Sequence, residues 1–289
     1  MINGGTALLG LLGDPVRHSL SPVMQNAALQ TMGLNWSYVP LPCESGNLAA
    51  VLQGLHAVGC RGLNVTIPHK QNAASHCSEL SPLAKRLGAV NTLSPLDSGQ
   101  WRGSNTDVEG FLAPLKGQGE WQGRRALVIG NGGSARAVVA GLQTLALQSL
   151  TVVGRRREAL SGFISELSLQ QAPVRGCLID DPSLPDEIRA SDLVVNTTPV
   201  GMAEHDGADG VPLGLATWNN LSEGITLYDL IYTPRPTPWL AMGLERGFHC
   251  IDGLEMLVQQ GAASLRIWSG HQDVPVDVMR LEALKVLKA

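Results

Sequence analysis

The sequence predicts an α/β protein with two domains. Patterns typical of short apolar strands and of helices alternate along most of its 289 residues, as in proteins built on mostly parallel sheets. A polar, glycine-rich segment at 116–123 separates a first series of such elements from a second one. The second series opens with a strand and a glycine-rich loop, which is typical of a doubly wound, Rossmann-like nucleotide-binding domain.

Length and composition argue against several classes of protein. A chain of 30.6 kDa with 44% hydrophobic residues can bury a core in each of two domains. A net charge of −4 and an aromatic content of 4% argue against a nucleic-acid surface. Five scattered cysteines without a Cys-x-x-Cys pair argue against a disulfide framework or a zinc cage. With no recognisable signal peptide or membrane span, we expect a cytoplasmic protein without nucleic-acid or membrane partners, a monomer or a homodimer.

The first domain is expected to span residues 1–108. Its apolar runs predict strands at 7–12, 36–41, 62–66 and 89–93, and its helical patterns lie at 22–32, 48–58 and 72–87. Pro82 is expected to break the last of these helices. A strand and loop at 101–107 then lead into a helix at 108–115, which would connect the two domains.

The second domain is expected to span residues 109–254. Its strands are predicted at 125–129, 150–153, 178–179, 193–196 and 227–230, with a helix at 137–147 after the glycine-rich loop. Two further helical patterns, at 254–268 and 276–287, lie beyond this series. We expect residues 255–289 to return to the first domain and pack on it.

The glycine-rich loop is a candidate cofactor site. Gly130-x-Gly132-x-x-Ala135 fits the dinucleotide fingerprint, and the whole loop comprises Gly130, Asn131, Gly132, Gly133, Ser134 and Ala135. Glycines allow a tight turn and let backbone N–H groups approach a pyrophosphate, while the following helix directs its positive end toward that anion.

The end of the next strand indicates which dinucleotide is bound. An NAD-preferring site usually carries an acidic residue there for the ribose 2′-hydroxyl. This chain instead carries Arg155, Arg156 and Arg157. Three guanidinium groups beside a helix start are unfavourable without an anion, and they would bind a 2′-phosphate through charge-assisted hydrogen bonds. The sequence therefore predicts NADP as the cofactor.

A second distinctive run ends in Lys70, a candidate acid–base residue. The run 62–70 joins a short apolar strand to a proline-led helix start, which would deliver Lys70 to the end of the strand. Three further polar strings lie at 18–22, 88–92 and 103–107.

With these strings, the chain resembles the shikimate dehydrogenase family over nearly its whole length. The other matching strings lie at 13–15, 196–202, 228–232, 237–238 and 252–254, and Gln260 matches as well. The resemblance implies an N-terminal substrate domain, a Rossmann-like NADP domain and an active site in the cleft between them. It also implies the reversible, NADP-linked oxidation of shikimate to 3-dehydroshikimate, in the pathway to chorismate and the aromatic amino acids.

The resemblance implies a role for each matching residue. Lys70 and Asp107 would be the catalytic pair, although which of them transfers the proton stays open. Leu230 and Gly253 would border the nicotinamide. The substrate would be bound by Ser19 and Ser21 at its carboxylate and by Asn64, Thr66, Asn91, Tyr232 and Gln260 around its ring. No histidine pair has metal-ligand spacing, so no metal is expected and His18 and His69 are interpreted as structural.

The match is imperfect at two places. Gln25-Asn26 stands where the family usually has His-Asn, and Gly154-Arg155-Arg156 stands where it usually has Asn-Arg-Thr. Three alternatives therefore stay open: a quinate/shikimate dehydrogenase that uses NAD or quinate, a non-catalytic NADP-binding regulator, and a folate-linked dehydrogenase of related plan.

Overall fold

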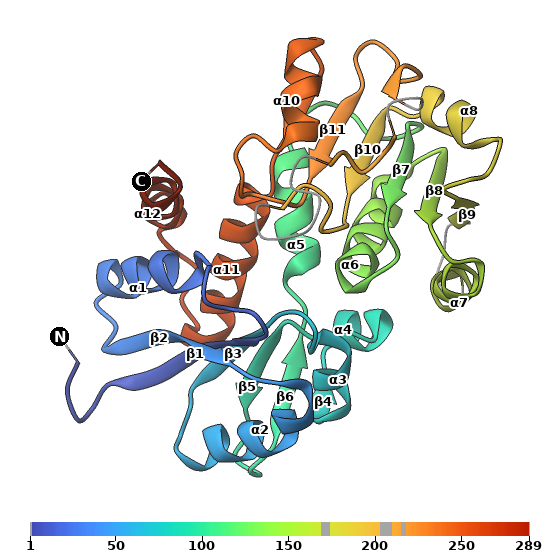
Figure 1. The fold of residues 1–289 in the computed structure, drawn as a ribbon. Coiled ribbons are helices and arrows are strands. Elements are labelled where there is room, and N and C mark those ends of the chain that lie inside the picture. Colours follow the sequence, from blue (N-terminus) through green and yellow to red (C-terminus); the bar gives the residue numbers. More distant parts are fainter. Residues whose placement is uncertain (1, 169–173, 203–209, 215–217, 289) are drawn as a thin grey trace. The chain divides into compact units, whose positions relative to one another are not determined.

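The fold is described by a computed structural model for residues 2–168, 174–202, 210–214 and 218–288 (Figure 1). The chain divides into two compact units, Met1–Gly110 with Leu257–Ala289, and Phe111–Met256. Each unit contains a six-stranded sheet and flanking helices, so the predicted α/β fold class is confirmed. Within the described ranges, none of the helices combines the length and the apolar character needed to cross a membrane.

The first unit is built mainly from the N-terminal third of the chain. Its elements are β1 (Ala7–Gly13), α1 (Ser21–Thr31), β2 (Trp36–Pro42), α2 (Leu48–Ala57), β3 (Gly62–Val65), α3 (Lys70–Ser75), β4 (Cys77–Leu80), α4 (Pro82–Leu87), β5 (Thr92–Pro95), β6 (Trp101–Ser104), α5 (Asp107–Leu112), α11 (Leu254–Ser269) and α12 (Val276–Lys288). Helices α5 and α11 each extend a few residues into the other unit.

The sheet of the first unit is mixed, with the strand order β2-β1-β3-β5-β6-β4. Strand β1 pairs in parallel with β2 and β3, whereas β5 runs antiparallel to both β3 and β6. The expectation of a mostly parallel sheet therefore holds for this unit, apart from the antiparallel strand β5. In the β3–β5 register Asn64 lies opposite Thr92, which brings two of the predicted polar strings together at the centre of the sheet.

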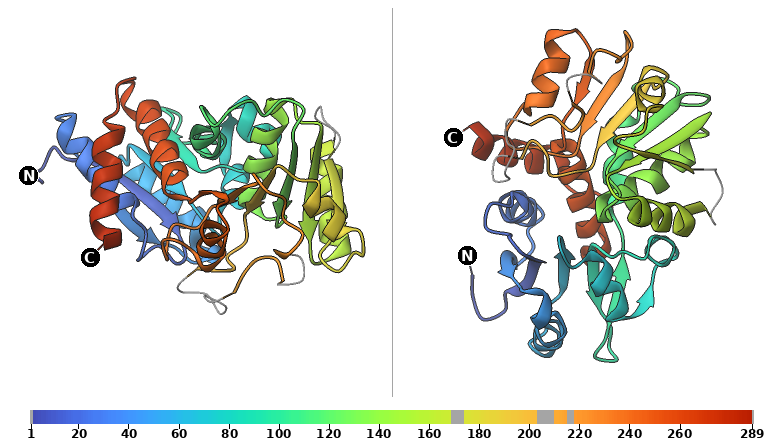
Figure 2. Two further views of the ribbon diagram at one scale, coloured as in Figure 1. Left: turned by 90° about the horizontal axis from the view of Figure 1, so that it is seen from above. Right: turned by 45° about the vertical axis from the view of Figure 1, so that its right-hand side comes forward.

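Helices cover both faces of this sheet. One face packs on α2, α3 and α4 through an apolar cluster that includes Leu48, Leu63, Ala73 and Leu93. On the other face the indole N–H of Trp268, in α11, donates to the carbonyl oxygen of Leu93 at 3.0 Å. Figures 1 and 2 show α1 and α2 on opposite sides of the strands. In the structure, the segment Leu257–Ala289 belongs to this unit.

The predicted helix at 72–87 is wrong in its middle. The structure has helix α3, then the short strand β4, and then helix α4, which begins at Pro82. Strand β4 forms because it pairs with β6 at the edge of the sheet, a long-range contact that helical periodicity cannot reveal. The predicted break at Pro82 is confirmed, and the hydroxyl of Ser81 caps α4 by accepting from the Ala84 N–H at 3.1 Å.

The predicted start of the helix that carries Lys70 also needs correction. Pro68 does not occupy the first helical turn; it follows a cis peptide bond in a turn, and α3 begins at Lys70 itself. The strand predicted at 89–93 likewise lies later, at Thr92–Pro95. Residues 89–91 form a non-regular segment instead, anchored where the Val90 N–H donates to the Lys70 carbonyl oxygen at 2.8 Å.

The second unit contains the predicted βα series. Its elements are β7 (Arg125–Ile129), α6 (Gly133–Leu142), β8 (Ser149–Gly154), α7 (Arg157–Ser168), β9 (Val174–Leu178), α8 (Leu184–Arg189), β10 (Leu193–Asn196), β11 (Thr226–Asp229), α10 (Pro238–Glu245) and β12 (His249–Ile251). The bounds predicted for β7 and β10 are confirmed, and β9 begins earlier than expected. The short elements α8, α10 and β12 were not predicted.

All strands of this second sheet are parallel, in the order β12-β11-β10-β7-β8-β9. The order of strands along the sheet reverses between β7 and β10, as in a Rossmann fold, where ligands bind outside the carboxyl ends of the strands. Alternate residues of β7 enter opposite cores: Ala126 and Val128 pack with α6 and α7, and Leu127 and Ile129 pack with α8 and α10. The doubly wound arrangement thus buries both faces, as a parallel sheet requires.

Gly62 offers a test of the packing of α11 on the first sheet. A Cβ atom at Gly62 would lie 2.3 Å from Nε1 of the buried Trp268 indole. We expect Gly62→Ala to lower the free energy of unfolding by about 1–3 kcal/mol, the usual cost of overpacking a core. Denaturant unfolding followed by circular dichroism measures this effect.

Gly54→Ala is the matched control, because Gly54 lies within α2 and a Cβ atom there would meet no other atom within 4 Å. This variant should be more stable than the wild type by about 0.5–1 kcal/mol, because alanine favours the helix. Equal stability of the two variants would contradict the proposed close packing at Gly62.

Candidate active site

Lys70 and Asp107 form a close ion pair in the first unit. The Lys70 Nζ atom lies 2.8 Å from Oδ2 of Asp107, and their side chains are only 14% and 6% exposed. Lys70 is the first residue of α3 and Asp107 the first residue of α5. The fold therefore brings together, from 37 residues apart, the two residues predicted to be catalytic.

Two asparagines hold Asp107 in place, one at its carboxylate and the other at its backbone N–H. The Nδ2 atom of Asn91 donates to Asp107 Oδ1 at 2.8 Å. The Asn105 side-chain oxygen accepts from the Asp107 backbone N–H at 3.0 Å, and the Asn105 amide nitrogen donates to the Ala89 carbonyl oxygen. One carboxylate oxygen is thus engaged by an amide and the other by an ammonium, which fixes the orientation of the acid.

Asn91 is the centre of this arrangement. Its Oδ1 atom accepts from the Thr106 backbone N–H at 2.8 Å and from the Thr92 hydroxyl at 2.9 Å. Besides Asp107, its Nδ2 atom donates to the Thr106 hydroxyl at 2.9 Å and approaches Oε1 of Gln260 at 3.4 Å. Gln260 comes from α11, so one predicted substrate residue is supplied by the C-terminal segment.

Asn64, near the end of β3, extends the network on the other side. Its Nδ2 atom donates to the Ser264 hydroxyl at 2.9 Å and to the Asn91 carbonyl oxygen at 3.0 Å. Its Oδ1 atom accepts from the Tyr38 hydroxyl at 2.9 Å. Burial raises the pKa of the Tyr38 phenol above its usual value, so Tyr38 stays protonated and acts as a donor.

The remaining predicted substrate residues of this unit lie near the starts of helices. Ser21 is the first residue of α1, and its backbone N–H donates to the Ser19 hydroxyl oxygen at 3.2 Å. Thr66 follows β3, and its backbone groups bond to Leu12 and His69. The buried His69 has a structural contact, because its Nε2 atom donates to the Cys43 carbonyl oxygen at 2.6 Å. Across the described ranges, no three His, Cys, Asp or Glu side chains cluster as a metal site would require.

The glycine-rich loop of the second unit joins β7 to α6 with the features of a phosphate cradle. Gly130 has a φ of +104°, and a Cβ atom there would lie 2.6 Å from Oγ1 of Thr197, so only glycine fits against the end of β10. Gly132 and Gly133 instead face open space, and they form the N-cap and first residue of α6. Backbone N–H groups at a helix start with open space above them fit a pyrophosphate.

The three predicted phosphate-binding arginines are all exposed at the carboxyl end of β8. Arg157 lies near Asp181, whose pKa is lowered mainly by hydrogen bonds from Ser183 and to a smaller extent by the charge of Arg157. Neither Arg155 nor Arg156 forms an ion pair with any residue in the described part of the chain. Their positive charge fits the 2′-phosphate of NADP.

The two residues expected to border the nicotinamide touch each other. A Cβ atom at Gly253 would lie 1.9 Å from the Leu230 carbonyl oxygen, so no larger residue fits there. Both lie in the second unit, as does the half-buried Tyr232.

The loop that contains Leu230 and Tyr232 is held by Asp229, which is completely buried. The carboxylate of Asp229 accepts from the Asn196 amide, the Ile231 backbone N–H and the Thr237 hydroxyl at 3.0, 3.1 and 2.8 Å. Burial raises the pKa of Asp229 to about 6, although these hydrogen bonds oppose the shift.

Comparison with known proteins supplies the identity that this geometry suggests. Two family models match the chain, the shikimate dehydrogenase substrate binding domain at residues 11–93 and the shikimate 5′-dehydrogenase C-terminal domain at residues 253–283. The NADP(+) shikimate dehydrogenase of Synechocystis sp. is 47% identical over 288 residues, which cover 99% of this chain and 98% of that protein. The chain belongs to the shikimate dehydrogenase family.

Solved structures of the family have the same fold. A crystal structure of shikimate dehydrogenase in complex with NADP+ has a TM-score of 0.89 and 33% identity, covering 99% of this chain and 98% of that one. The enzyme from Thermus thermophilus, in complex with NADP(H) and shikimate, has a TM-score of 0.85 and 33% identity, covering 97% of this chain and 100% of that one.

Gln25 is the clearest departure from the family pattern within the first unit. The buried Gln25 side chain donates from Nε2 to the Gly261 carbonyl oxygen at 3.1 Å, so it joins α1 to α11. Asn26 donates to the Tyr38 carbonyl oxygen and accepts from the Tyr38 N–H, at 2.8 and 2.9 Å. Among the described residues, the hydrogen bonds of Gln25 and Asn26 do not involve Lys70 or Asp107.

Sequence reasoning missed two residues that the structure places in the network, Tyr38 and Ser264. For Ser264 a signal existed, because it lies four residues after Gln260 and therefore on the same face of a helix. For Tyr38 there was none, since a tyrosine in a strand is most often a packing residue.

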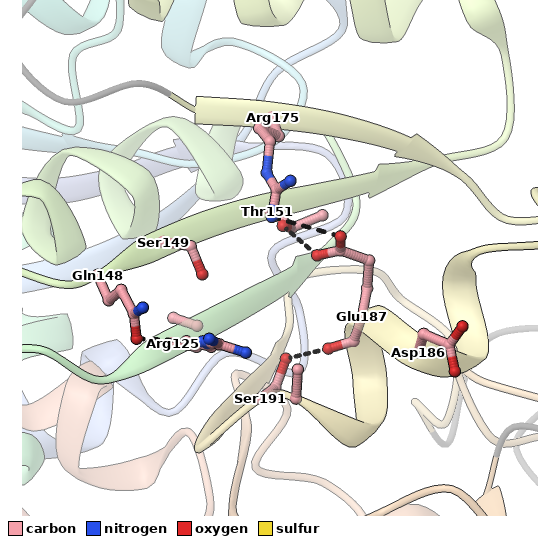
Figure 3. Close-up of a pocket in the computed structure, with 10 residues that line it drawn as sticks. Arg125, Gln148, Ser149, Thr151, Arg175, Asp186, Glu187 and Ser191 are labelled. Atoms are coloured by element: carbon pink, nitrogen blue, oxygen red, sulfur yellow. Dashed lines mark hydrogen bonds and ion pairs between the residues drawn. The ribbon is translucent and has the colours of Figure 1, made fainter.

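A depression of about 480 Å³ lies elsewhere in the second unit, at the amino ends of β7 and β8 (Figure 3). The family's dinucleotide loop follows the carboxyl end of β7, so this depression lies at the opposite edge of the sheet. Its polar groups bond to one another: Glu187 accepts from the Thr151 hydroxyl at 2.9 Å and pairs with Arg175 at 3.4 Å. These pairs are typical of a structural cluster.

The buried carboxylate of Asp229 predicts a specific pH dependence of stability. The pKa of Asp229 in the folded protein lies above that in an unfolded chain, so the folded state binds this proton more tightly. The stabilisation that the protonated carboxyl group gives is therefore complete below about pH 4 and is lost as the pH rises through about 6. Between pH 7 and pH 5 the wild type should therefore gain about 1 kcal/mol relative to Asp229→Asn, which cannot ionise.

Thermal or denaturant unfolding of both proteins at pH 5, 6 and 7 measures this difference, and other carboxylates cancel because both proteins share them. A difference that stays constant, or that grows with rising pH, would contradict the assignment of a raised pKa to Asp229.

Proposed function

We propose that this protein catalyses the reversible, NADP-linked interconversion of shikimate and 3-dehydroshikimate. The observation that supports this most directly is the Lys70–Asp107 pair, 2.8 Å apart and surrounded by amide and hydroxyl side chains, in a chain of the shikimate dehydrogenase family. A buried ammonium and carboxylate at the edge of a polar network are suited to moving a proton to or from a substrate hydroxyl.

Oxidation of a secondary alcohol removes a hydride from carbon and a proton from oxygen. Bound NADP supplies the hydride acceptor. In our proposal, Lys70 and Asp107 hold the reacting hydroxyl and take up its proton as a unit, and they return the proton in the reverse direction. Since the two groups are coupled by a hydrogen bond at 2.8 Å, the proton is assigned to the pair and to neither residue alone.

The substrate residues divide by the part of shikimate that they would bind. Ser19 and Ser21 offer hydroxyl donors for the carboxylate. Asn64, Thr66, Asn91 and Gln260 offer amides and a hydroxyl for the ring hydroxyls, and Tyr232 contributes from the second unit. A site built from such groups rejects analogues that lack a hydroxyl, because its buried polar atoms would then lose their partners.

The glycine-rich loop and the arginines after β8 would bind the cofactor. The open space above Gly132 and Gly133 supports a pyrophosphate there, and the exposed Arg155 and Arg156 support a 2′-phosphate. Leu230 and Gly253 would border the nicotinamide. We further propose that the enzyme works in the cytoplasm as a monomer or homodimer, without a membrane or nucleic-acid partner, in agreement with its small net charge of −4.

A steady-state assay with purified protein tests the proposed function. Shikimate with NADP should give NADPH at a rate well above those for quinate with NADP and shikimate with NAD. Faster turnover of quinate, or of NAD, would favour a quinate/shikimate dehydrogenase. No turnover in any combination, with NADPH still bound, would indicate a non-catalytic nucleotide-binding protein.

The arginines allow a sharper test of the cofactor site. Arg155→Ala and Arg156→Ala should each lower kcat/KM for NADP by about 10–100-fold, the effect of losing a charge-assisted hydrogen bond. The value for NAD should change less than about threefold, because NAD has no 2′-phosphate.

Arg157→Ala is the matched control, because Arg157 already lies near the carboxylate of Asp181. It should affect NADP less than either neighbour does. If all three variants used NADP as well as the wild type, the arginine cluster would have no part in cofactor selection.

A further inference from the structure

Ser264 occupies a place in the first unit that no motif accounts for. It lies in α11, its side chain is completely buried, and it faces three side chains from distant parts of the sequence. Its Oγ atom lies 2.9 Å from Nδ2 of Asn64, 2.9 Å from the Thr92 hydroxyl and 3.2 Å from the Thr106 hydroxyl.

The hydroxyl proton of Ser264 is already committed. The Oγ atom donates to the Gln260 carbonyl oxygen, one helical turn earlier, at 3.0 Å. Because a serine hydroxyl has one proton and two acceptor positions, Ser264 can only accept, and from at most two other neighbours. The Thr92 hydroxyl proton is directed to Asn91 Oδ1 at 2.9 Å, so the two acceptor positions fit Asn64 and Thr106. The group that it presents to Asn64 is therefore a fixed acceptor.

This acceptor and the Asn91 carbonyl oxygen together orient the Asn64 amide. The two protons of Nδ2 are directed to Ser264 Oγ at 2.9 Å and to the Asn91 carbonyl oxygen at 3.0 Å. Within the described residues, Oδ1 receives one hydrogen bond, from the Tyr38 hydroxyl at 2.9 Å. An amide oxygen can accept two, so Asn64 offers one acceptor position and no free donor to a ligand.

We propose that Ser264 is a positioning residue for substrate binding: it holds the Asn64 amide so that its oxygen accepts from a hydroxyl group of the substrate. This inference rests on the proposed function, since it needs a polyhydroxylated substrate in the site of the first unit. A reversed amide would present N–H groups, which a hydroxyl can meet only with its oxygen. Ser264 thus links helix α11 to the recognition of a substrate hydroxyl group by Asn64, near the end of β3.

The variants Ser264→Ala and Ser264→Cys test the proposal. Alanine removes the acceptor, and cysteine keeps the side chain's shape but accepts hydrogen bonds weakly. Both should lower kcat/KM for shikimate by about tenfold, a typical effect of misplacing a binding group. The KM for NADP should stay within about twofold of the wild type, because the hydrogen bonds of Ser264 lie within the polar network of the first unit, away from the glycine-rich loop.

Ser269→Ala is the matched control. Ser269 lies in the same helix and makes the same kind of bond, to the Leu265 carbonyl oxygen at 2.7 Å, while its oxygen accepts from the His271 backbone N–H rather than from Asn64. This variant should keep the wild-type kcat/KM. If Ser264 only stabilised the helix, both alanine variants would lower the melting temperature and neither would alter kcat/KM for shikimate.

A double-mutant cycle with Asn64→Ala decides whether Ser264 acts through Asn64. In the Asn64→Ala background, Ser264→Ala should change kcat/KM for shikimate by less than about threefold, because the amide that it orients is gone. A full tenfold loss in that background, or no loss in the wild-type background, overturns the inference. Lack of shikimate turnover in the wild type itself would instead overturn the proposed function, which is measured first.

Discussion

The contact between the Lys70 ammonium and the Asp107 carboxylate constrains the rest of the first unit. Both side chains are largely buried, and a buried charge that loses its partner costs a protein about 3–5 kcal/mol. The fold must therefore place the two side chains in contact, although one residue begins α3 and the other begins α5. Strand β5 lies between β3 and β6 and runs antiparallel to both, and this arrangement meets the requirement. It brings Asn64, Asn91 and the 105–107 segment to the same region of the sheet.

The same polar groups explain how helix α11 is held in the first unit. Gln260 and Ser264 enter the network from α11, and Trp268 anchors that helix to the Leu93 carbonyl oxygen. Buried amides and hydroxyls are costly unless each finds a partner. Here the network from Tyr38 to Lys70 connects its members through side-chain hydrogen bonds at 2.8–3.2 Å. An arrangement so fully bonded is rigid, which suits a site that must orient one hydroxyl among several.

The structural elements that depend on local sequence could be predicted. The strand at 125–129, the glycine-rich loop and the helix after it are visible because adjacent residues determine them. Long-range pairing is different: β4 forms only because β6 lies beside it, and nothing within residues 77–80 indicates a strand. The Lys70–Asp107 contact was expected from the family resemblance alone, since no periodicity joins residues 37 positions apart. Tyr38 was missed because no local pattern sets it apart from a packing residue, whereas Ser264 shares a helix face with Gln260.

A double-mutant cycle on the catalytic pair tests the central claim most directly. Lys70→Ala and Asp107→Asn should each lower kcat for shikimate oxidation by about 10²–10⁴-fold, and the double variant should lose little more than the worse single variant, because the two groups act as a unit. Lys85→Ala, which removes an exposed lysine of the same unit, should keep the wild-type rate. Losses that multiply in the double variant, or a Lys70→Ala enzyme with an unchanged rate, would contradict the account.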